Sequence, residues 1–245
     1  MAAIPVFGRV VGALAVAPGF GLHAVPMRVR IAAAVVLTPA ILPIAGPVRP
    51  DIAAPPVLIA ATIEQLAIGL GLGFGASLFF YGVGIAGAFA DRQLGLPFAV
   101  GFARPGSGQW GPLGAFYFVF ATLVFFAIDG HHALLSGLAR SFAALPVAGT
   151  VAADVVSERF CGLTGTLFVA ALEVGAPVVA AVFIADVAIA LASRAAPALQ
   201  PLGVGLPVRC AVGLFAVALS LPLVVGAVQG YCRQLADALA RLVSG

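Results

Sequence analysis

The chain has 245 residues, of which 62% are hydrophobic and only 9% are charged. Soluble domains carry roughly 25% charged residues, and the 12 basic residues, all arginine, and 9 acidic ones are too few to cover a water-soluble protein of this size. The composition argues against a soluble enzyme or a disordered chain, and the scattered arginines form no cluster that would bind nucleic acid. The length instead suits a bundle of several bilayer-length helices.

Long segments without Asp, Glu, Lys or Arg are the predicted helices. A helix rises ~1.5 Å per residue, so about 20 apolar residues cross a hydrocarbon core of ~30 Å. The segments are continuously apolar, which favours helices over the short alternating strands of a β-barrel. We therefore predict five or six hydrophobic helices. In chain order the segments are 10–27, 31–48, 65–90, 105–128, of which 105–112 is predicted to be loop, 160–185 with Glu173 as an interruption, and 210–232.

The connectors between these segments are short, and we predict a single domain over 1–245. The longest polar stretch, about 91–112, is rich in glycine and proline and is predicted to be a central loop. The fold class is therefore all-α: a hydrophobic, membrane-associated multi-helix bundle of helical hairpins with a central glycine-rich loop. Residues 230–245 have helical periodicity, which predicts a short amphipathic helix outside the last span. Its apolar face holds Leu235, Leu239, Leu242 and Val243.

Two glycine patterns lie inside the 65–90 segment. Gly69, Gly73 and Ser77 recur every four residues, and such a row of small side chains lets another helix approach closely. We expect helix packing there. Gly82, Gly84 and Gly87 form a G-x-G-x-x-G pattern, but no predicted strand precedes it and no acid follows at the spacing of a dinucleotide site. We therefore expect no nucleotide to bind.

Five charged side chains fall within apolar surroundings. Each costs several kcal/mol if it faces lipid, so each is expected to face protein, water or another charge. Structural pairing, or packing against partner subunits, is the favoured interpretation, and a proton relay is the alternative. The five are Glu64, Glu173, Asp186, Arg194 and Arg209.

The sequence offers no catalytic or metal-binding constellation. Asp129 precedes Gly130, His131 and His132, but adjacent histidines on a helix point about 100° apart and cannot easily share one ion. We expect a helix cap at Asp129 beside two interfacial histidines. The odd number of cysteines, without C-x-x-C spacing, indicates neither a disulfide framework nor a zinc site. No enzyme activity, catalytic residue, metal or cofactor is predicted.

Several motifs in register resemble the FliR family, the integral subunits of the flagellar type III protein-export gate, whose injectisome relatives are the SctT proteins. The stretch Arg9 to Arg30, with Ala17-Pro18 and then residues 25–31, is similar to the family's opening. The later motifs occur in the family's order and extend along nearly the whole chain. They are 64–74, 92–108, 126–135 with 141–146, 185–197, and 204–208.

The resemblance implies a function that composition could not show. The protein is expected to be an export-gate subunit in the bacterial inner membrane, at the flagellar basal body, assembled with FliP-like, FliQ-like and FlhB-like subunits. Its substrates would be unfolded exported polypeptides, with no role for nucleic acid or a cofactor. A virulence-type injectisome subunit is the nearest alternative, although Val204 to Pro207 favours the flagellar branch. A small-solute or ion transporter, with Glu64, Glu173 and Asp186 as coupling acids, is an alternative of a different class.

By the same resemblance, the central loop is the plug that closes the resting pore. The chain departs from the family pattern at Arg104, at Asp91 and Arg92, and at 200–202, which bears on the details of plug contacts and partner fit. The loop residues implied are Gly95, Leu96, Pro97, Phe98, Ala99, Phe102 and Pro105.

Overall fold

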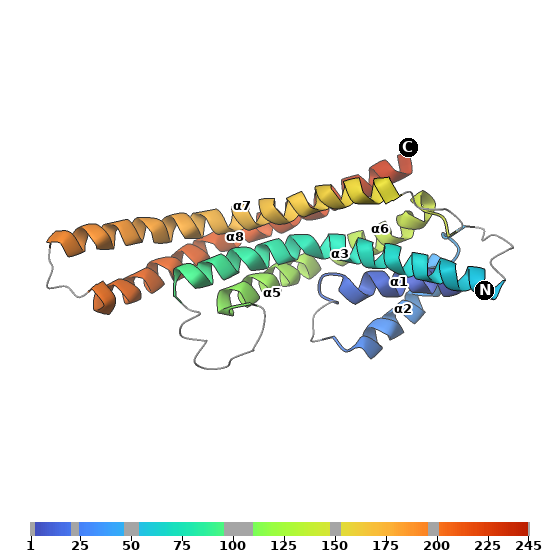
Figure 1. The fold of residues 1–245 in the computed structure, drawn as a ribbon, viewed down its shortest axis with the longest axis horizontal. Coiled ribbons are helices and arrows are strands. Elements are labelled where there is room, and N and C mark those ends of the chain that lie inside the picture. Colours follow the sequence, from blue (N-terminus) through green and yellow to red (C-terminus); the bar gives the residue numbers. More distant parts are fainter. Residues whose placement is uncertain are drawn as a thin grey trace. The chain divides into compact units, whose positions relative to one another are not determined.

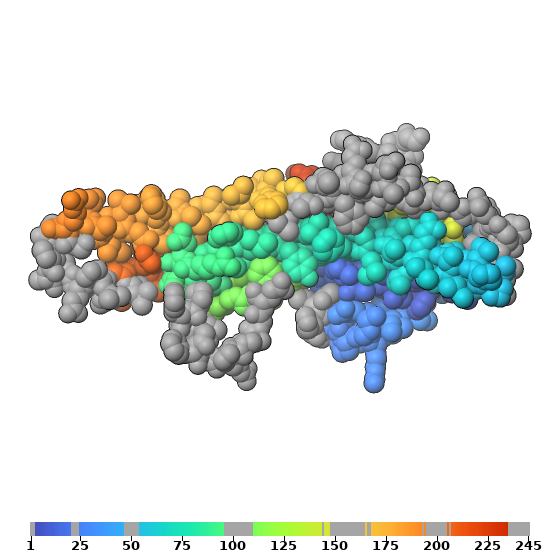
Figure 2. Space-filling view, viewed as in Figure 1, coloured from blue at the N-terminus to red at the C-terminus, as the bar shows by residue number. Residues whose placement is uncertain are grey.

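The computed structural model describes residues 3–20, 25–46, 54–95, 110–147, 153–195 and 201–244. Within these ranges the chain forms helices joined by turns, and the all-α prediction is confirmed. Figure 1 shows the helices, and Figure 2 colours the residues whose side chains are described. The helices are α1 (Ala3–Val16), α2 (Met27–Ile41), α3 (Pro55–Gln93), α5 (Pro112–Ala127), α6 (Gly130–Ala144), α7 (Ala153–Ala195) and α8 (Pro201–Ser244).

Three of the described helices are long and apolar enough to cross a membrane. The qualifying segments are Pro55–Gln93, Phe168–Ala192 and Pro207–Gln234, and α5 with α6 would make a fourth span if the pair is counted as one broken span. In lipid a helix satisfies its backbone hydrogen bonds within its own segment, which is why continuously apolar sequence takes this form. The membrane-associated bundle predicted from the sequence is thus confirmed.

The helix boundaries differ from the charge-free segments. The first apolar segment is divided, because α1 ends at Val16 and the next helix begins only at Met27. Helix α3 has 39 residues and begins at Pro55, where the fixed φ of proline suits a first helical position. The predicted amphipathic segment 230–244 continues α8 without a break. Charge content thus located the apolar centres of the helices but not their ends.

Contacts within the chain group the residues into two compact units. The first holds Met1–Leu78, Phe125–Thr164 and Gly230–Gly245. Its core is built on α1, where Val6, Val10 and Leu14 lie four residues apart and form one buried stripe. Residues from α2 and α6 complete this core, among them Ala34, Ile41, Leu138 and Phe142.

The second unit holds Phe79–Val124 and Gly165–Gln229. Within it α7 and α8 run antiparallel as a helical hairpin (Figure 1). The buried face of α7 is a stripe of valines. In the same unit, the hydroxyls of Tyr117 on α5 and Ser220 on α8 form a buried hydrogen bond. The valine stripe consists of Val174, Val178 and Val182.

Candidate functional site

The central loop begins where α3 ends. Leu94 still donates its N–H to the Ala90 carbonyl, and Gly95 follows with φ +72°, donating its N–H to the Arg92 carbonyl at 3.1 Å. A left-handed residue directly after a helix is usually glycine, because a Cβ is strained there. Gly95 therefore stops α3. The other predicted plug residues lie outside the described residues: Leu96, Pro97, Phe98, Ala99, Phe102 and Pro105.

Asp91, in the last turn of α3, caps the helix that follows the loop. Its Oδ1 accepts the N–H of Leu113 at 3.0 Å and its Oδ2 accepts the N–H of Gly114 at 3.0 Å. The side chain is 1% exposed. The first amides of a helix lack intrahelical partners and carry the positive end of the helix dipole, so a carboxylate is stabilised there. One buried side chain thus connects the end of α3 to the start of α5.

Glycines let α3 and α5 cross at short range beside this cap. A Cβ at Gly87 would lie 2.5 Å from the Leu113 carbonyl oxygen and 2.8 Å from the Gly114 Cα. Gly84 faces the ring of Trp110, and a Cβ there would lie 3.3 Å from it. The G-x-G-x-x-G pattern therefore lies inside α3, without a preceding strand, and its last two glycines make room for α5.

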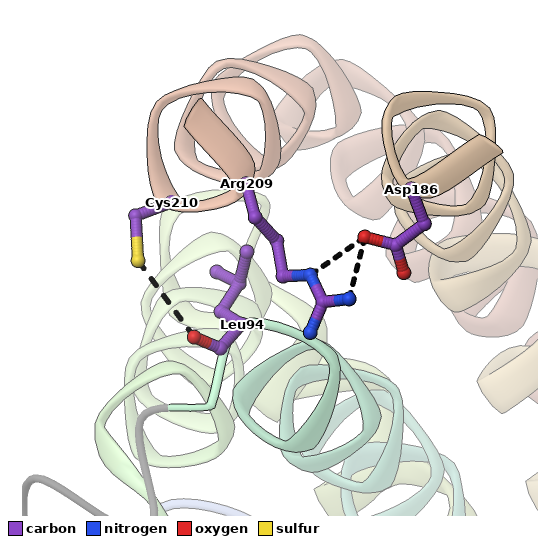
Figure 3. A network of polar contacts seen from close by, with 4 residues as sticks. All are labelled: Leu94, Asp186, Arg209 and Cys210. Atoms are coloured by element: carbon purple, nitrogen blue, oxygen red, sulfur yellow. Dashed lines mark hydrogen bonds and ion pairs between the residues drawn. The ribbon is translucent and has the colours of Figure 1, made fainter. Parts of the chain in front are cut away.

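The end of α3 also contacts α8. The Leu94 carbonyl accepts a weak hydrogen bond from the thiol of Cys210 at 3.7 Å (Figure 3). A Cβ at Gly213 would collide with the Leu94 side chain, so that side chain packs directly onto the glycine. Both contacts come from adjacent turns of α8 and hold the last residues of α3 in place.

Two of the five predicted charges form an ion pair next to this contact, since Arg209 directly precedes Cys210. Arg209 on α8 donates from Nε to Oδ1 of Asp186 on α7 at 2.6 Å, and its Nη2 lies 2.6 Å from the same oxygen (Figure 3). The side chains are 37% and 29% exposed respectively. The pair connects the two arms of the α7–α8 hairpin.

The other three predicted charges have different surroundings. Glu173 and Arg194 on α7 are exposed on the chain, and Glu64 on α3 is half-buried. The only described ion pair among the five is that of Asp186 with Arg209. Of the three acids named as coupling acids of the transporter alternative, only Asp186 forms an ion pair in the part of the chain that the structure describes.

Arg9 is the most deeply buried charge described, and its burial was not predicted from the sequence. Its Nε donates to Gln65 Oε1 at 2.7 Å, its Nη1 to Ser141 Oγ at 3.1 Å and its Nη2 to the Leu145 carbonyl at 2.7 Å. The guanidinium carbon lies 4.0 Å from the centroid of the Phe142 ring. Burial lowers the pKa of Arg9 to about 10, and the nearby charge of Glu64 opposes that shift. Arg9 thus remains charged at neutral pH and ties α1 to α3 and α6.

The predicted packing glycines lie where α3 crosses α1. A Cβ at Gly69 would collide with the Arg9 carbonyl oxygen, and one at Gly73 with the Ala13 carbonyl oxygen. Ser77 is buried and donates its hydroxyl to the Phe74 carbonyl at 2.8 Å. Gly69 and Gly73 therefore face the α1 backbone, whereas Ser77 satisfies its hydroxyl within α3.

Asp129, His131 and His132 come together at the start of α6. Their ligand atoms all lie within 4.8 Å of one another, so the predicted divergence of the two histidines is wrong. Asp129 Oδ1 lies 4.0 Å from Nε2 of His131 and 3.6 Å from Nδ1 of His132. A ligating histidine normally donates its other ring N–H to an acceptor, whereas Nδ1 of His131 is buried without a hydrogen-bond partner among the described residues. Asp129, His131 and His132 lie close enough to contact one metal ion, but His131 lacks the second hydrogen bond that orients a ligating histidine in the described part of the chain.

Signals for the missed residues are visible in retrospect. Arg9 is a lone charge in an apolar helix, a feature that calls for a protein partner. Asp91 lies at a helix C-terminus, where the helix dipole disfavours an acid, so a hydrogen-bond donor outside its own helix is expected for it. Neither partner, however, could be identified from sequence spacing.

Comparisons with known proteins match most of the chain to bacterial export proteins. The family model for bacterial export proteins, family 1, matches residues 1–235. The flagellar biosynthetic protein FliR of Pectobacterium carotovorum subsp. carotovorum is 30% identical over 185 residues, which are 74% of this chain and 70% of that protein. FliR of Bacillus subtilis (strain 168) is 33% identical over 154 residues, 61% of this chain and 59% of that protein. The Yop proteins translocation protein T of Yersinia pestis is 30% identical over 177 residues, 70% of this chain and 62% of that protein.

Proposed function

Because the chain belongs to the bacterial export proteins of family 1, we propose that it is a membrane subunit of the flagellar type III protein-export gate. Two of the relatives are flagellar biosynthetic proteins by name, and a third is a Yop translocation protein. The description of the family as bacterial export proteins, together with the translocation named for the Yersinia relative, supports an export role rather than an enzymatic one. The flagellar branch is supported by the FliR relatives and by the segment Val204 to Pro207.

The observation that carries the proposal is how little of each spanning helix the chain buries by itself. In an 18-residue apolar window of each of the three membrane-length segments, only 17%, 28% and 33% of the residues are buried within the chain. Large apolar side chains such as Phe168, Phe183 and Phe215 are more than 60% exposed. A solute carrier would need an enclosed polar path, and one cavity in the described part of the chain, between α1, α3 and α6, is about 60 Å³ and lined by Ala, Leu and Gly rather than by polar residues. Lipid and sibling subunits are the surroundings that fit such helices.

The role within the gate is to help form and close the conduit. The loop from Gly95 to Pro105 acts as the plug of the resting state. Phe98 and Phe102 supply apolar bulk, and substrate docking displaces the loop. The described loop ends support this role, since Gly95 stops α3 and Asp91 caps α5. Energy for export comes from other subunits.

The partners are FliP-like, FliQ-like and FlhB-like subunits in the bacterial inner membrane, at the flagellar basal body. The apolar flanks of the spanning helices bind the FliP-like and FliQ-like chains. The exported cargo is unfolded polypeptide.

Deletion of the gene with export as the readout tests the function. Cells that lack the protein should stop releasing flagellar proteins into the medium and lose motility, and the intact chain supplied from a plasmid should restore both. Normal export by the deletion strain would contradict the proposal. So would a solute flux catalysed by the purified chain alone in liposomes.

A shortened loop tests the gate mechanism. Removal of residues 96–104 should make membranes that contain the resting assembly permeable to ions, because the plug is gone. Membranes that remain as tight as those with the intact chain would contradict the plug.

A further inference from the structure

The cap at the start of α5 is unusual because the capping residue comes from another helix. An N-cap side chain normally belongs to the residue that directly precedes the helix. Here that position is Gly111, whose carbonyl accepts the N–H of Ala115 at 2.9 Å and which has no side chain. The carboxylate comes instead from Asp91, which precedes Leu113 by 22 residues. The cap therefore joins two segments that lie on opposite sides of the central loop.

The neighbouring residues are shaped around this carboxylate. A Cβ at Gly111 would collide with Oδ2 of Asp91, so glycine at the ordinary capping position leaves room for the side chain from α3. Gly87, one turn earlier on α3, brings the α5 backbone close enough for the two bonds. Trp110 stacks on Tyr81 with ring centroids 6.3 Å apart, which anchors the residue before Gly111 to α3 as well. All these contacts lie within one of the two compact units.

We propose that Asp91 is a positioning residue that fastens the two ends of the central loop to each other, so that the loop leaves and rejoins the helices at one fixed junction. This junction is defined by Gly87, Asp91, Gly111, Leu113 and Gly114. Its consequence for gating rests on the proposed function, whereas the junction itself does not. A plug must return to the same place after displacement, and a fixed junction limits where the loop can go.

Asp91→Asn and Asp91→Ala separate this role from general support of the fold. Asparagine keeps the size of the side chain but turns an N–H donor toward one of the two backbone donors, and alanine removes both acceptors. Either change should release the start of α5 from the end of α3. Spin labels at Arg92 and Ala115, which are both exposed, report the separation of the two ends. The three cysteines are replaced by alanine in every sample.

The measurement is a distance distribution between the two labels by pulsed electron resonance, on the full chain in lipid nanodiscs. With Asp91 intact, the distribution should be narrow. In both variants it should broaden and shift to longer distances. A second label pair at Val119 on α5 and Leu223 on α8, both exposed, is the control and should not change. An unchanged Arg92–Ala115 distribution in both variants would overturn the proposal. A parallel change in both label pairs would overturn it too, because Asp91 would then support the whole unit.

An ion-permeability assay separates the proposal about the Asp91 junction from the proposal that the loop is a plug. In membranes with the assembled gate, Asp91→Asn should raise the leak, and removal of 96–104 should raise it further. A tight membrane with the shortened loop would contradict the plug while the label distances still decide the role of Asp91. A leaky shortened loop with unchanged label distances in the Asp91 variants would contradict the junction alone.

Discussion

Nε of Arg9 donates a hydrogen bond to Oε1 of Gln65 across 2.7 Å, and both side chains are fully buried. The amide nitrogen of Gln65 has no hydrogen-bond partner in the described part of the chain. The Arg9 guanidinium therefore donates to the neutral amide oxygen of Gln65, while the amide nitrogen of the same side chain lacks an acceptor in the described part of the chain. Ser141 Oγ and the Leu145 carbonyl accept the other two hydrogen bonds of the guanidinium. This arrangement predicts how the stability should respond to changes at Gln65.

Gln65→Glu should raise the free energy of unfolding. Glutamate removes the unsatisfied N–H and gives the buried cation a counter-ion, and a buried charge is costly unless it is paired and hydrogen-bonded. Gln65→Leu should lower the free energy of unfolding by about 1–3 kcal/mol, because it leaves a buried donor of Arg9 without its acceptor. Thermal unfolding of both variants in one detergent checks this. Equal destabilisation by glutamate and leucine would mean that Arg9 is not a buried cation.

Gly73→Leu should break the crossing of α1 and α3. A side chain there meets the backbone of α1 at Ala13, which cannot move as a flexible side chain can. Overpacking of this kind costs about 1–3 kcal/mol or more. Gly226→Leu is the matched control, since it also adds leucine to a long apolar helix, but a Cβ there meets nothing within 4 Å among the described residues.

Thermal unfolding of the isolated chain should separate these two glycine variants. Gly73→Leu should unfold at a clearly lower temperature, and Gly226→Leu should match the parent. If both variants lose the same stability, the loss comes from the helix itself and not from the crossing.

Exchange of the charges between Asp186 and Arg209 should restore the stability that each single substitution loses. Asp186→Asn leaves a partly exposed arginine without its anion near the start of a membrane-length segment, which should lower the unfolding temperature. The double variant Asp186→Arg with Arg209→Asp rebuilds the pair. A double-mutant cycle on unfolding temperature measures the coupling, which for neighbouring residues is about 0.5–3 kcal/mol. Additive losses would show that the pair contributes no stability to the hairpin.

Asp129→Gly should preserve or raise stability, whereas Asp129→Val should lower it. Asp129 adopts φ +57°, a left-handed conformation that costs roughly 1–2 kcal/mol for residues with a Cβ and more for β-branched ones. Its side chain makes no capping hydrogen bond to α6, so glycine loses little by removing it. Relative to the parent, the unfolding temperature should therefore stay the same or rise for Asp129→Gly and fall for Asp129→Val. A stabilising valine would contradict the backbone argument.

The sequence predicted the fold class because apolar runs of bilayer length leave few alternatives to helices. It did not predict where the helices end. Val16 ends α1 inside a charge-free segment, and Pro55 begins α3 ten residues before the next one. Helix ends depend on local backbone geometry and on caps such as Asp91, whose partners at Leu113 and Gly114 lie far away in sequence.

The candidate site was predictable only in part. The small side chains at Gly69 and Gly73 signalled a close helix approach, but only the structure identifies α1 as the helix that approaches. Asp186 and Arg209 were recognised as charges that need partners, and their pairing depends on how α7 folds back on α8. Pairings across helices are set by three-dimensional packing, which residue spacing does not encode.

The central claim is that these apolar helices serve to be covered by sibling subunits around a closable conduit for polypeptide. Native mass spectrometry of the affinity-tagged chain, purified from cells that express its genomic neighbours, tests it most directly. The account predicts one assembly that contains this chain together with FliP-like and FliQ-like subunits. A chain that is recovered only as a monomer, from cells in which those subunits are present in the membrane, would contradict the account.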